Sequence, residues 1–224
     1  MLKFKLLSIF PDIFDSYLNE SIIKRAQKQK IISVKSYDLR KWTTDKHQSV
    51  DDSPYGGGAG MLLKIEPLYR ALKYLNKNPK EKTYKRKVVL LSASGQTWTQ
   101  AKAQKYSKLE ELILISGRYE GVDARIKNFI DEEISIGNYV LTGGELASLV
   151  ILDSITRLLP GALGNQASTK DESYSEIKVL EYPQYTRPAI FKADHKNYSV
   201  PKILLSGNHA AIKKWQQDHR RQIS

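Results

Sequence analysis

Two short runs of large apolar residues, Val88–Leu91 and Leu112–Ile115, constrain the fold of this chain more than any other feature. Turn-forming residues bound each run, and neither run shows the alternation of a strand with one wet face. Both runs therefore predict strands buried on both faces, as in a parallel sheet. A polar stretch of helical length, 98–109, lies between them, and such a strand–helix–strand unit is typical of α/β proteins. Apolar residues at 2–10 and β-branched residues at 31–39 predict two further strands.

Three other stretches have helical periodicity, at 13–29, 64–76 and 145–159. The last of them, ELASLVILDSITRLL, is apolar nearly all round, which predicts a helix that is deeply packed on every side. A short apolar run at 134–136 predicts one more strand. Together these elements indicate a single α/β domain over residues 1–160.

The composition of the chain changes after Leu159. Residues 161–174 are rich in Gly, Ser, Thr, Asn and Gln and offer little apolar surface to bury, so they predict a mobile interdomain linker. Residues 175–224 contain several prolines and end in a helical tail. We therefore expect a second domain here that is small, basic and helical.

The charge balance indicates the kind of partner. The chain has 36 Lys and Arg against 24 Asp and Glu, a formal net charge of +12, which favours a polyanion such as nucleic acid. A basic surface that is merely solvated is the alternative explanation.

Several classes of protein and site are not expected from this sequence. The chain contains no run of about 18 apolar residues, and its N-terminal segment lacks the apolar centre and cleavage site of a signal peptide. We therefore expect a cytoplasmic protein without a membrane span. The chain has no cysteine, and its four histidines lack metal-ligand spacing, so no metal site is expected.

Three glycine-bearing loops, at 55–61, 116–121 and 136–145, suggest a ligand site. Glycine lets the backbone approach a ligand closely, and open α/β sheets bind small molecules at the carboxyl ends of their strands. Tight turns without a ligand are the alternative. The chain has no P-loop, dinucleotide fingerprint or nucleophile elbow, so phosphoryl, hydride and acyl transfer are poorly supported.

Six segments occur in this order between residues 54 and 215: PYGGGAGM, SGRYEGVDAR, EISIGNYVLTGGEL, RLLPGALGN, LEYPQYTRP and LLSGNHAAIKKW. In this order they resemble the bacterial tRNA (guanine-N1)-methyltransferase family, TrmD. The resemblance implies a knotted (trefoil), mostly parallel α/β sheet of the SPOUT methyltransferase type, followed by a small helical C-terminal domain. It also implies a homodimer whose active sites are shared between the subunits. The implied donor is S-adenosyl-L-methionine, and the implied acceptor is N1 of guanine 37 in tRNA, next to the anticodon.

In that family the donor lies against three loops at the knot. Apolar side chains of these loops suit an adenine ring, and Glu120 suits the cationic portion of the donor. An ion pair with Arg118 or Arg125 is the alternative role for Glu120. One departure is Ala93, which stands where the family commonly has proline. The matching donor-binding residues here are Leu91, Ser92, Gly117, Tyr119, Glu120, Ile136, Gly137, Asn138, Tyr139, Val140, Leu141, Gly143 and Gly144.

The resemblance also implies the catalytic residues. Arg157 matches an arginine whose guanidinium can hold the negative charge that develops on guanine O6, although an arginine at a helix C-terminus is common without such a role. The family's general base is a linker aspartate followed by serine and an aromatic residue. Here Glu172 directly precedes Ser173 and Tyr174. We therefore expect Glu172 to accept the proton of guanine N1, with Asp171 as the second candidate.

The C-terminal segment resembles the family's RNA-gripping motif at Ser206, Asn208, His209 and Lys213. Trp215 is equally compatible with a core position, and Gln216 stands where the family usually has arginine. A dependence on Mg²⁺ is not readable from the sequence. The alternative function is a non-catalytic basic RNA-binding or ribosome-associated α/β protein, because the charge and the tethered tail suit it equally well.

Overall fold

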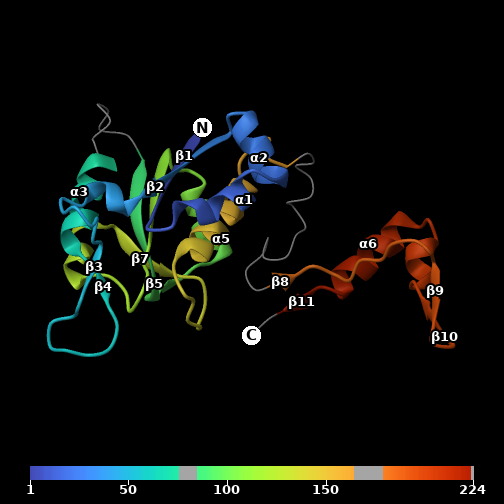
Figure 1. The fold of residues 1–224 in the computed structure, drawn as a ribbon. Coiled ribbons are helices and arrows are strands. Elements are labelled where there is room, and N and C mark those ends of the chain that lie inside the picture. The colour runs from blue at the N-terminus through green and yellow to red at the C-terminus, as the bar shows by residue number, and fades with distance from the viewer. Residues whose placement is uncertain (76–84, 164–178, 223–224) are drawn as a thin grey trace. The chain divides into compact units, whose positions relative to one another are not determined.

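A five-stranded sheet, in which all strands are parallel, organises the N-terminal part of the chain (Figure 1). The computed structural model describes residues 1–75, 85–163 and 179–222. The chain divides into two units, Met1–Gly164 and Asn165–Ser224. The sheet has the order β2-β1-β6-β5-β7, so the predicted α/β class with a mostly parallel sheet is confirmed. Its strands are β1 (Leu2–Ser8), β2 (Ile32–Asp38), β5 (Arg86–Thr97), β6 (Glu111–Ser116) and β7 (Glu132–Ser135).

The two apolar runs that predicted buried strands form the centre of the sheet. Every residue of β6 is buried, and β6 pairs with β1 on one side and with β5 on the other. β5 is longer than predicted, because it continues through polar residues to Thr97 and pairs with β7 a second time after a register shift. Gly95 lies in this extension, where a Cβ atom would be 2.5 Å from the backbone nitrogen of Ile134. The apolar pattern could not reveal an exposed polar extension of this kind.

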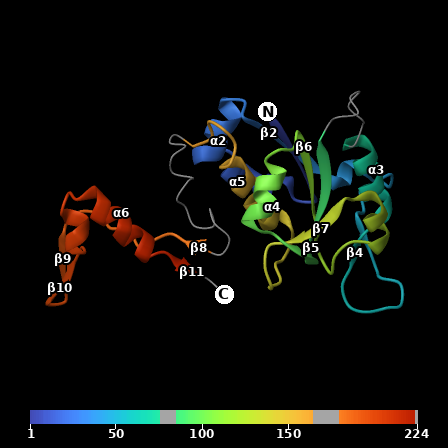
Figure 2. The same ribbon diagram turned by 180° about the vertical axis from the view of Figure 1, so that it is seen from behind.

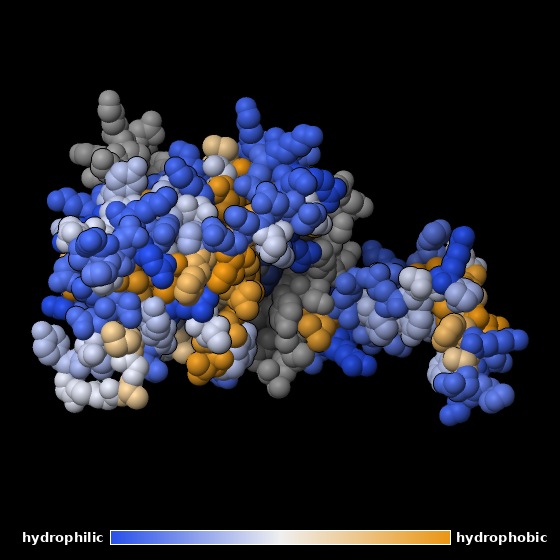
Figure 3. Space-filling view, viewed as in Figure 1, coloured by the Kyte–Doolittle hydropathy of each residue, from blue (hydrophilic) through white to orange (hydrophobic). Residues whose placement is uncertain are grey.

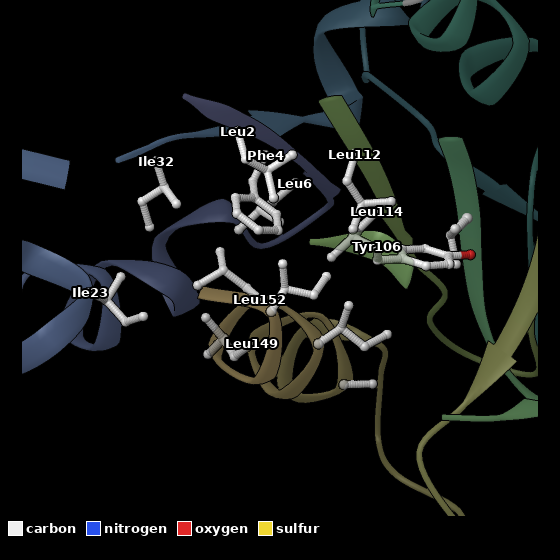
Figure 4. Close-up of a cluster of buried hydrophobic side chains, with 14 of the residues drawn as sticks. Leu2, Phe4, Leu6, Ile23, Ile32, Tyr106, Leu112, Leu114, Leu149 and Leu152 are labelled. Atoms are coloured by element: carbon white, nitrogen blue, oxygen red, sulfur yellow. The ribbon is translucent and has the colours of Figure 1, made fainter. Parts of the chain in front are cut away.

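Helices cover both faces of the sheet (Figures 1 and 2). One face packs against α2 (Ser21–Lys28), α4 (Gln100–Tyr106) and α5 (Glu145–Thr156), and the other packs against α3 (Ile65–Leu75) and the 3-10 helices η2 (Leu39–Trp42) and η3 (Ala124–Phe129). Alternation along the strands divides the apolar residues between these two cores. Figure 4 shows the first core, where the sheet residues Phe4, Leu6, Leu112 and Leu114 lie opposite Leu149 and Leu152 of α5.

Two helix predictions need correction. The helix expected at 13–29 is divided into η1 (Pro11–Phe14), α1 (Asp15–Leu18) and α2. The break between α1 and α2 lies at Glu20, whose backbone is extended, and at Ser21, whose φ is +48°. The helix expected at 145–159 ends at Thr156 and is not packed on every side, since Leu146 is 58% exposed and Val150 is 45% exposed. Figure 3 shows hydrophobic residues at the surface over α5 and the loop before it.

The second unit contains helices and short strands. Its helices are η5 (Lys202–Leu205) and α6 (His209–Asp218), where the sequence predicts a helical tail. It also has two antiparallel strand pairs that the sequence analysis did not predict. The first pair joins β8 (Val179–Leu180) to β11 (Arg221–Gln222), and the second joins β9 (Ile190–Ala193) to β10 (Lys196–Ser199). None of the residues 179–222 is buried.

A short strand pair completes the first unit, in which β3 (Asp51–Asp52) pairs with β4 (Leu62–Leu63). Among the residues that the structure describes, no helix has the length and apolarity needed to cross a membrane. Of the predicted linker 161–174, residues 164–174 lie outside the described ranges.

Candidate functional site

A pocket of about 370 Å³ opens at the carboxyl ends of β6 and β7, beside residues 90–94 in the middle of β5. Most of its lining comes from three segments of neighbouring parallel strands: residues 90–94 of β5, where pairing with β6 stops, residues 117–122 after β6, and residues 134–144 from the end of β7 onward. The carboxyl ends of parallel strands meet at one edge of a sheet, which is where open α/β proteins bind ligands. The volume lies within the range of pockets that take a small molecule.

The structure brings together twelve of the thirteen donor-binding residues expected from the sequence. Asn138 alone does not line the pocket. Val140 and Tyr139 are among the exposed apolar residues of the wall, so this wall offers apolar surface to a ligand rather than to the core. The twelve are Leu91, Ser92, Gly117, Tyr119, Glu120, Ile136, Gly137, Tyr139, Val140, Leu141, Gly143 and Gly144.

Several residues of the pocket and one residue behind it were not predicted from the sequence. Arg118 lines the pocket, and its guanidinium nitrogen Nε lies 3.1 and 3.0 Å from the two carboxylate oxygens of Glu145. Glu145 begins α5 and is 2% exposed, and it also accepts a hydrogen bond from Ser8 Oγ at 2.5 Å. An acidic residue at the start of a mostly apolar helix is the signal that could have identified Glu145. The other lining residues outside the predicted donor set are Leu90, Ala93, Ser94, Gly121, Val122, Ile134, Ser135, Thr142 and Ala147.

This buried ion pair joins three distant parts of the chain. Ser8 ends β1, Arg118 lies in the loop after β6, and Glu145 starts α5. Arg118 also donates a hydrogen bond to the carbonyl oxygen of Thr142 at 3.3 Å, and its guanidinium lies 4.9 Å from the centre of the Phe10 ring. Hydrogen-bonded charges of this kind hold a defined geometry, so the pair orients two of the three loops relative to each other.

Two glycines let the loops pack against each other this closely. A Cβ atom on Gly143 would lie 2.3 Å from Arg118 Nε and 2.5 Å from a carboxylate oxygen of Glu145. On Gly144 it would lie 2.8 Å from the Cα atom of Ser116 and 3.0 Å from the backbone nitrogen of Gly117. Gly144 instead donates a backbone hydrogen bond to the carbonyl oxygen of Gly117 at 2.9 Å. Only glycine therefore fits at both positions.

Glu120 pairs with neither of the arginines considered in the sequence analysis. Arg118 pairs with Glu145, and Arg125 pairs with Asp123 at 2.5 Å. The side chain of Glu120 instead lies against Gly60, where a Cβ atom would be 2.4 Å from Glu120 Cγ. Through this contact, and through a hydrogen bond from the Glu120 backbone nitrogen to the carbonyl oxygen of Met61 at 3.1 Å, the loop 55–61 contacts a residue of the pocket wall without lining the pocket itself.

Arg157 does not reach this pocket within one chain. It caps the C-terminus of α5, whereas Gly144 at the N-terminus of the same helix lines the pocket. The 12 residues of α5 rise about 1.5 Å each, so roughly 18 Å separate the two helix ends. The two candidates for the general base, Asp171 and Glu172, lie outside the described residues.

The predicted RNA-binding residues gather at one helix start in the second unit. Asn208 caps α6 by accepting a hydrogen bond from the backbone nitrogen of Ala211 at 3.1 Å, and Ser206 Oγ accepts one from the Asn208 backbone nitrogen at 3.2 Å. His209 and Lys213 are exposed on α6. Ser206, Asn208 and His209 therefore lie at the accessible start of α6, and Lys213 lies about one turn further along the helix.

Trp215 and Gln216 have structural partners in this unit. Trp215 stacks on His219 with ring centres 4.0 Å apart and contacts Tyr182 and Tyr185. Gln216 donates a hydrogen bond to the hydroxyl oxygen of Tyr182 at 2.9 Å. The aromatic cluster agrees with a packing role for Trp215. In the parts of the chain that the structure covers, no three His, Asp or Glu residues come together as a metal site would require.

Comparison with known proteins gives the family. The family model described as tRNA (Guanine-1)-methyltransferase TrmD matches residues 2–223. A protein of Dictyoglomus turgidum named tRNA (guanine-N(1)-)-methyltransferase is 48% identical over 217 residues, which cover 97% of this chain and 84% of that protein. Proteins with the same name from Heliobacterium modesticaldum and Staphylococcus epidermidis are 48% and 47% identical, and the matches cover 96% and 98% of this chain and 79% and 86% of theirs. The chain belongs to the TrmD family of tRNA (guanine-1)-methyltransferases.

Proposed function

We propose that this protein transfers the methyl group of S-adenosyl-L-methionine to N1 of guanine 37 in tRNA. The observation that carries this proposal is the pocket at the ends of β6 and β7, beside the middle of β5, built from the segments that resemble the family's donor site. The relatives are named for methylation of guanine N1 in tRNA, and the net charge of +12 suits a nucleic-acid substrate. A tRNA substrate also suits a cytoplasmic protein.

The pocket residues fit the proposed donor. Ile136, Val140 and Leu141 provide apolar surface for an adenine ring, and glycines 117, 143 and 144 add no side chain to the pocket wall. The carboxylate of Glu120 lies at the pocket wall, where it suits a cationic sulfur centre. The donor supplies an electrophilic methyl group, so that an N1–methyl bond forms as the sulfur–methyl bond breaks.

The chain's own residues have to manage the proton and the charge of the guanine. We assign Glu172 as the base that accepts the N1 proton, with Asp171 as the alternative, and Arg157 as the donor of hydrogen bonds to O6 as that oxygen gains negative charge. In this assignment residues 161–174 form the linker that carries the base, and residues 175–224 form the domain that holds the tRNA.

The position of Arg157 supports a homodimer with shared active sites. Leu146, Val150, Asp153 and Arg157 follow helical spacing and therefore lie on one face of α5, whose two apolar members are exposed. An exposed apolar stripe of this kind is suited to an interface. If two copies pack these helices antiparallel about a twofold axis, Arg157 of one subunit comes next to the pocket end of the other helix.

A trefoil knot is also part of the proposal. Between β7 and α5 the chain runs close to Leu91 in the middle of β5 and to the end of β6. Gly143 forms an antiparallel bridge with Arg118, and a Cβ atom on Gly144 would lie 3.1 Å from the side chain of Leu91. This close passage beside two strands supports the threaded path that the SPOUT fold implies.

The decisive test is methyl transfer to an unmodified tRNA transcript with guanine at position 37, beside the same transcript with adenine there. We expect transfer from radiolabelled S-adenosyl-L-methionine to the first transcript alone. Equal labelling of both would refute position 37 as the acceptor. The non-catalytic RNA-binding alternative predicts no transfer, and it predicts that saturating donor leaves the melting temperature unchanged, whereas a pocket that binds the donor raises it.

A further inference from the structure

A two-stranded hairpin in the second unit has no role in the site described above. Strands β9 and β10 are joined by the two-residue turn Asp194-His195, with φ values of 45° and 58°. Positive φ at both positions is the conformation that two-residue hairpin turns favour. A hydrogen bond of 2.9 Å from the backbone nitrogen of Val200 to the carbonyl oxygen of Ala189 closes the base of the hairpin. The hairpin is therefore a well-defined ribbon.

Two aromatic rings lie on the same face of this ribbon. Phe191 and Tyr198 are direct cross-strand partners, and their ring centres are 6.3 Å apart with planes tilted by 37°. The pair next to them, Ala193 and Lys196, points to the same face because alternate residues of a strand share a face. The opposite face carries Ile190, with Lys192 two residues along.

The aromatic face is not covered by other described residues of its unit. Phe191 is 58% exposed and Tyr198 is 53% exposed, and every residue of both strands except Ala193 is exposed. Hydrophobic residues also reach the surface of this unit in Figure 3, in the region where Figure 1 labels β9. A paired, exposed aromatic surface of this kind is suited to binding a partner.

The net charge of the second unit indicates the chemical class of the partner. Residues 179–222 contain eight Lys and Arg and three Asp and Glu, which leaves an excess of five positive charges. A partner that combines negative charge with flat apolar rings fits both features. Unpaired nucleotides do so, because their bases stack on aromatic side chains while Lys and Arg contact the phosphates.

We propose that the Phe191–Tyr198 face of the hairpin stacks on unpaired bases of the tRNA substrate, with Lys196 contacting an adjacent phosphate. This contact is separate from the cluster at the start of α6, and it rests on tRNA being the substrate, as proposed above. It adds affinity for tRNA and takes no part in the methyl transfer itself. Stacking contributes about 1–3 kcal/mol per base, which corresponds to roughly a 5- to 150-fold change in affinity.

The test measures binding of unmodified tRNA and the kinetic constants of the full-length protein carrying Phe191→Leu together with Tyr198→Leu. Leucine keeps an apolar surface but removes the rings. We expect the Kd and KM for tRNA to rise at least about fivefold, while the Kd for S-adenosyl-L-methionine and the kcat at saturating tRNA stay unchanged. Tyr198→Phe keeps a ring and should bind tRNA like the wild type. Ile190→Ala, on the opposite face of the same ribbon, is the matched control for hairpin stability.

A second arm tests the phosphate contact. Lys196→Gln should reduce the slope of log Kd for tRNA against log salt by about 0.7–0.9, as expected for the loss of one phosphate contact. Unchanged tRNA binding by the double leucine variant would overturn the proposal. The proposal would also be overturned if, without tRNA, the double leucine variant sedimented differently from the wild type, because the face would then bind a second copy of the chain. The binding of tRNA is measured without turnover, so the Kd values of the hairpin variants decide the role of the hairpin in either case. A failure to methylate tRNA would refute only the proposed function.

Discussion

Arg118 and Glu145 form a largely buried ion pair in which Nε of the arginine lies 3.0 and 3.1 Å from the two carboxylate oxygens. The two residues are 27 positions apart, and the pair connects the loop after β6 to the first turn of α5. Because Arg118 itself lines the pocket, the ion pair fixes part of the pocket wall.

Glu145→Gln should therefore weaken both the fold and donor binding. The substitution removes the charge that balances Arg118, and an unsatisfied buried polar group costs roughly 1–3 kcal/mol. We expect a lower melting temperature and a higher Kd for S-adenosyl-L-methionine by calorimetry. Lys127→Gln breaks an ion pair with Glu133 in which the lysine is 60% exposed, and it should cost less than about 0.5 kcal/mol. Equal effects of the two substitutions would contradict the role of Glu145.

Two glycines in the pocket should respond to alanine in different ways. Gly144→Ala places a methyl group against the backbone of Ser116 and Gly117, which cannot move aside, so we expect loss of folded protein. A Cβ atom on Gly117 would meet only the Leu91 carbonyl oxygen at 3.5 Å and Val122 Cγ1 at 3.7 Å. Gly117→Ala should therefore keep its melting temperature and lose only donor affinity. A stable Gly144→Ala protein would contradict the packing argument.

Mixing two inactive variants tests the shared active site. Arg157→Ala removes the proposed catalytic arginine, and Gly117→Leu fills the donor pocket. If Arg157 serves the pocket of the other subunit, a heterodimer of the two variants contains one intact site. Random exchange of subunits should then restore about a quarter of the wild-type sites. If Arg157 acts within its own chain, mixing restores nothing. Sedimentation of the wild type as a 25.5 kDa species alone would refute the dimer.

Glu172→Gln should slow the chemical step without affecting donor binding. Removing a general base slows the chemical step by at least roughly a hundredfold, and single-turnover methylation measures that step directly. Asp171→Asn is the matched control one position earlier. If Asp171→Asn is slow while Glu172→Gln is close to wild type, the assignment is displaced by one residue. If both variants react normally, neither residue is the base.

Stability in acid should depend on Glu132, which pairs with Lys87 at 2.9 Å and with Lys102 at 3.0 Å. Burial acts to raise the pKa of Glu132, but the two ammonium groups overcome this effect and lower the pKa from 4.5 to about 2. Because the folded-state pKa is the lower one, the stabilisation is present above about pH 4.5 and is lost as the pH falls toward 2. We expect the loss of melting temperature in Glu132→Gln to be large at pH 7 and to shrink at pH 3. Glu66→Gln, an exposed substitution on α3, should show no such convergence.

The sequence by itself was sufficient to predict the elements whose apolar residues follow a regular local pattern. Leu112–Ile115 predicts a strand buried on both faces because no polar residue interrupts it, and the structure places it in β6 at the centre of the sheet. Three glycine-bearing loops predict a ligand site for an equally local reason, since glycine tolerates close approach of the backbone.

Tertiary structure alone decided how distant residues meet. Ser8 and Glu145 are 137 positions apart, and neither residue carries a local signal for the other. The exposed stripe of Leu146 and Val150 looks identical in sequence to the buried face of α5, because periodicity reports which residues are apolar but not which surface covers them. The pairing of Phe191 with Tyr198 likewise depends on the turn at Asp194 and His195, whose backbone conformation sets the register of the two strands.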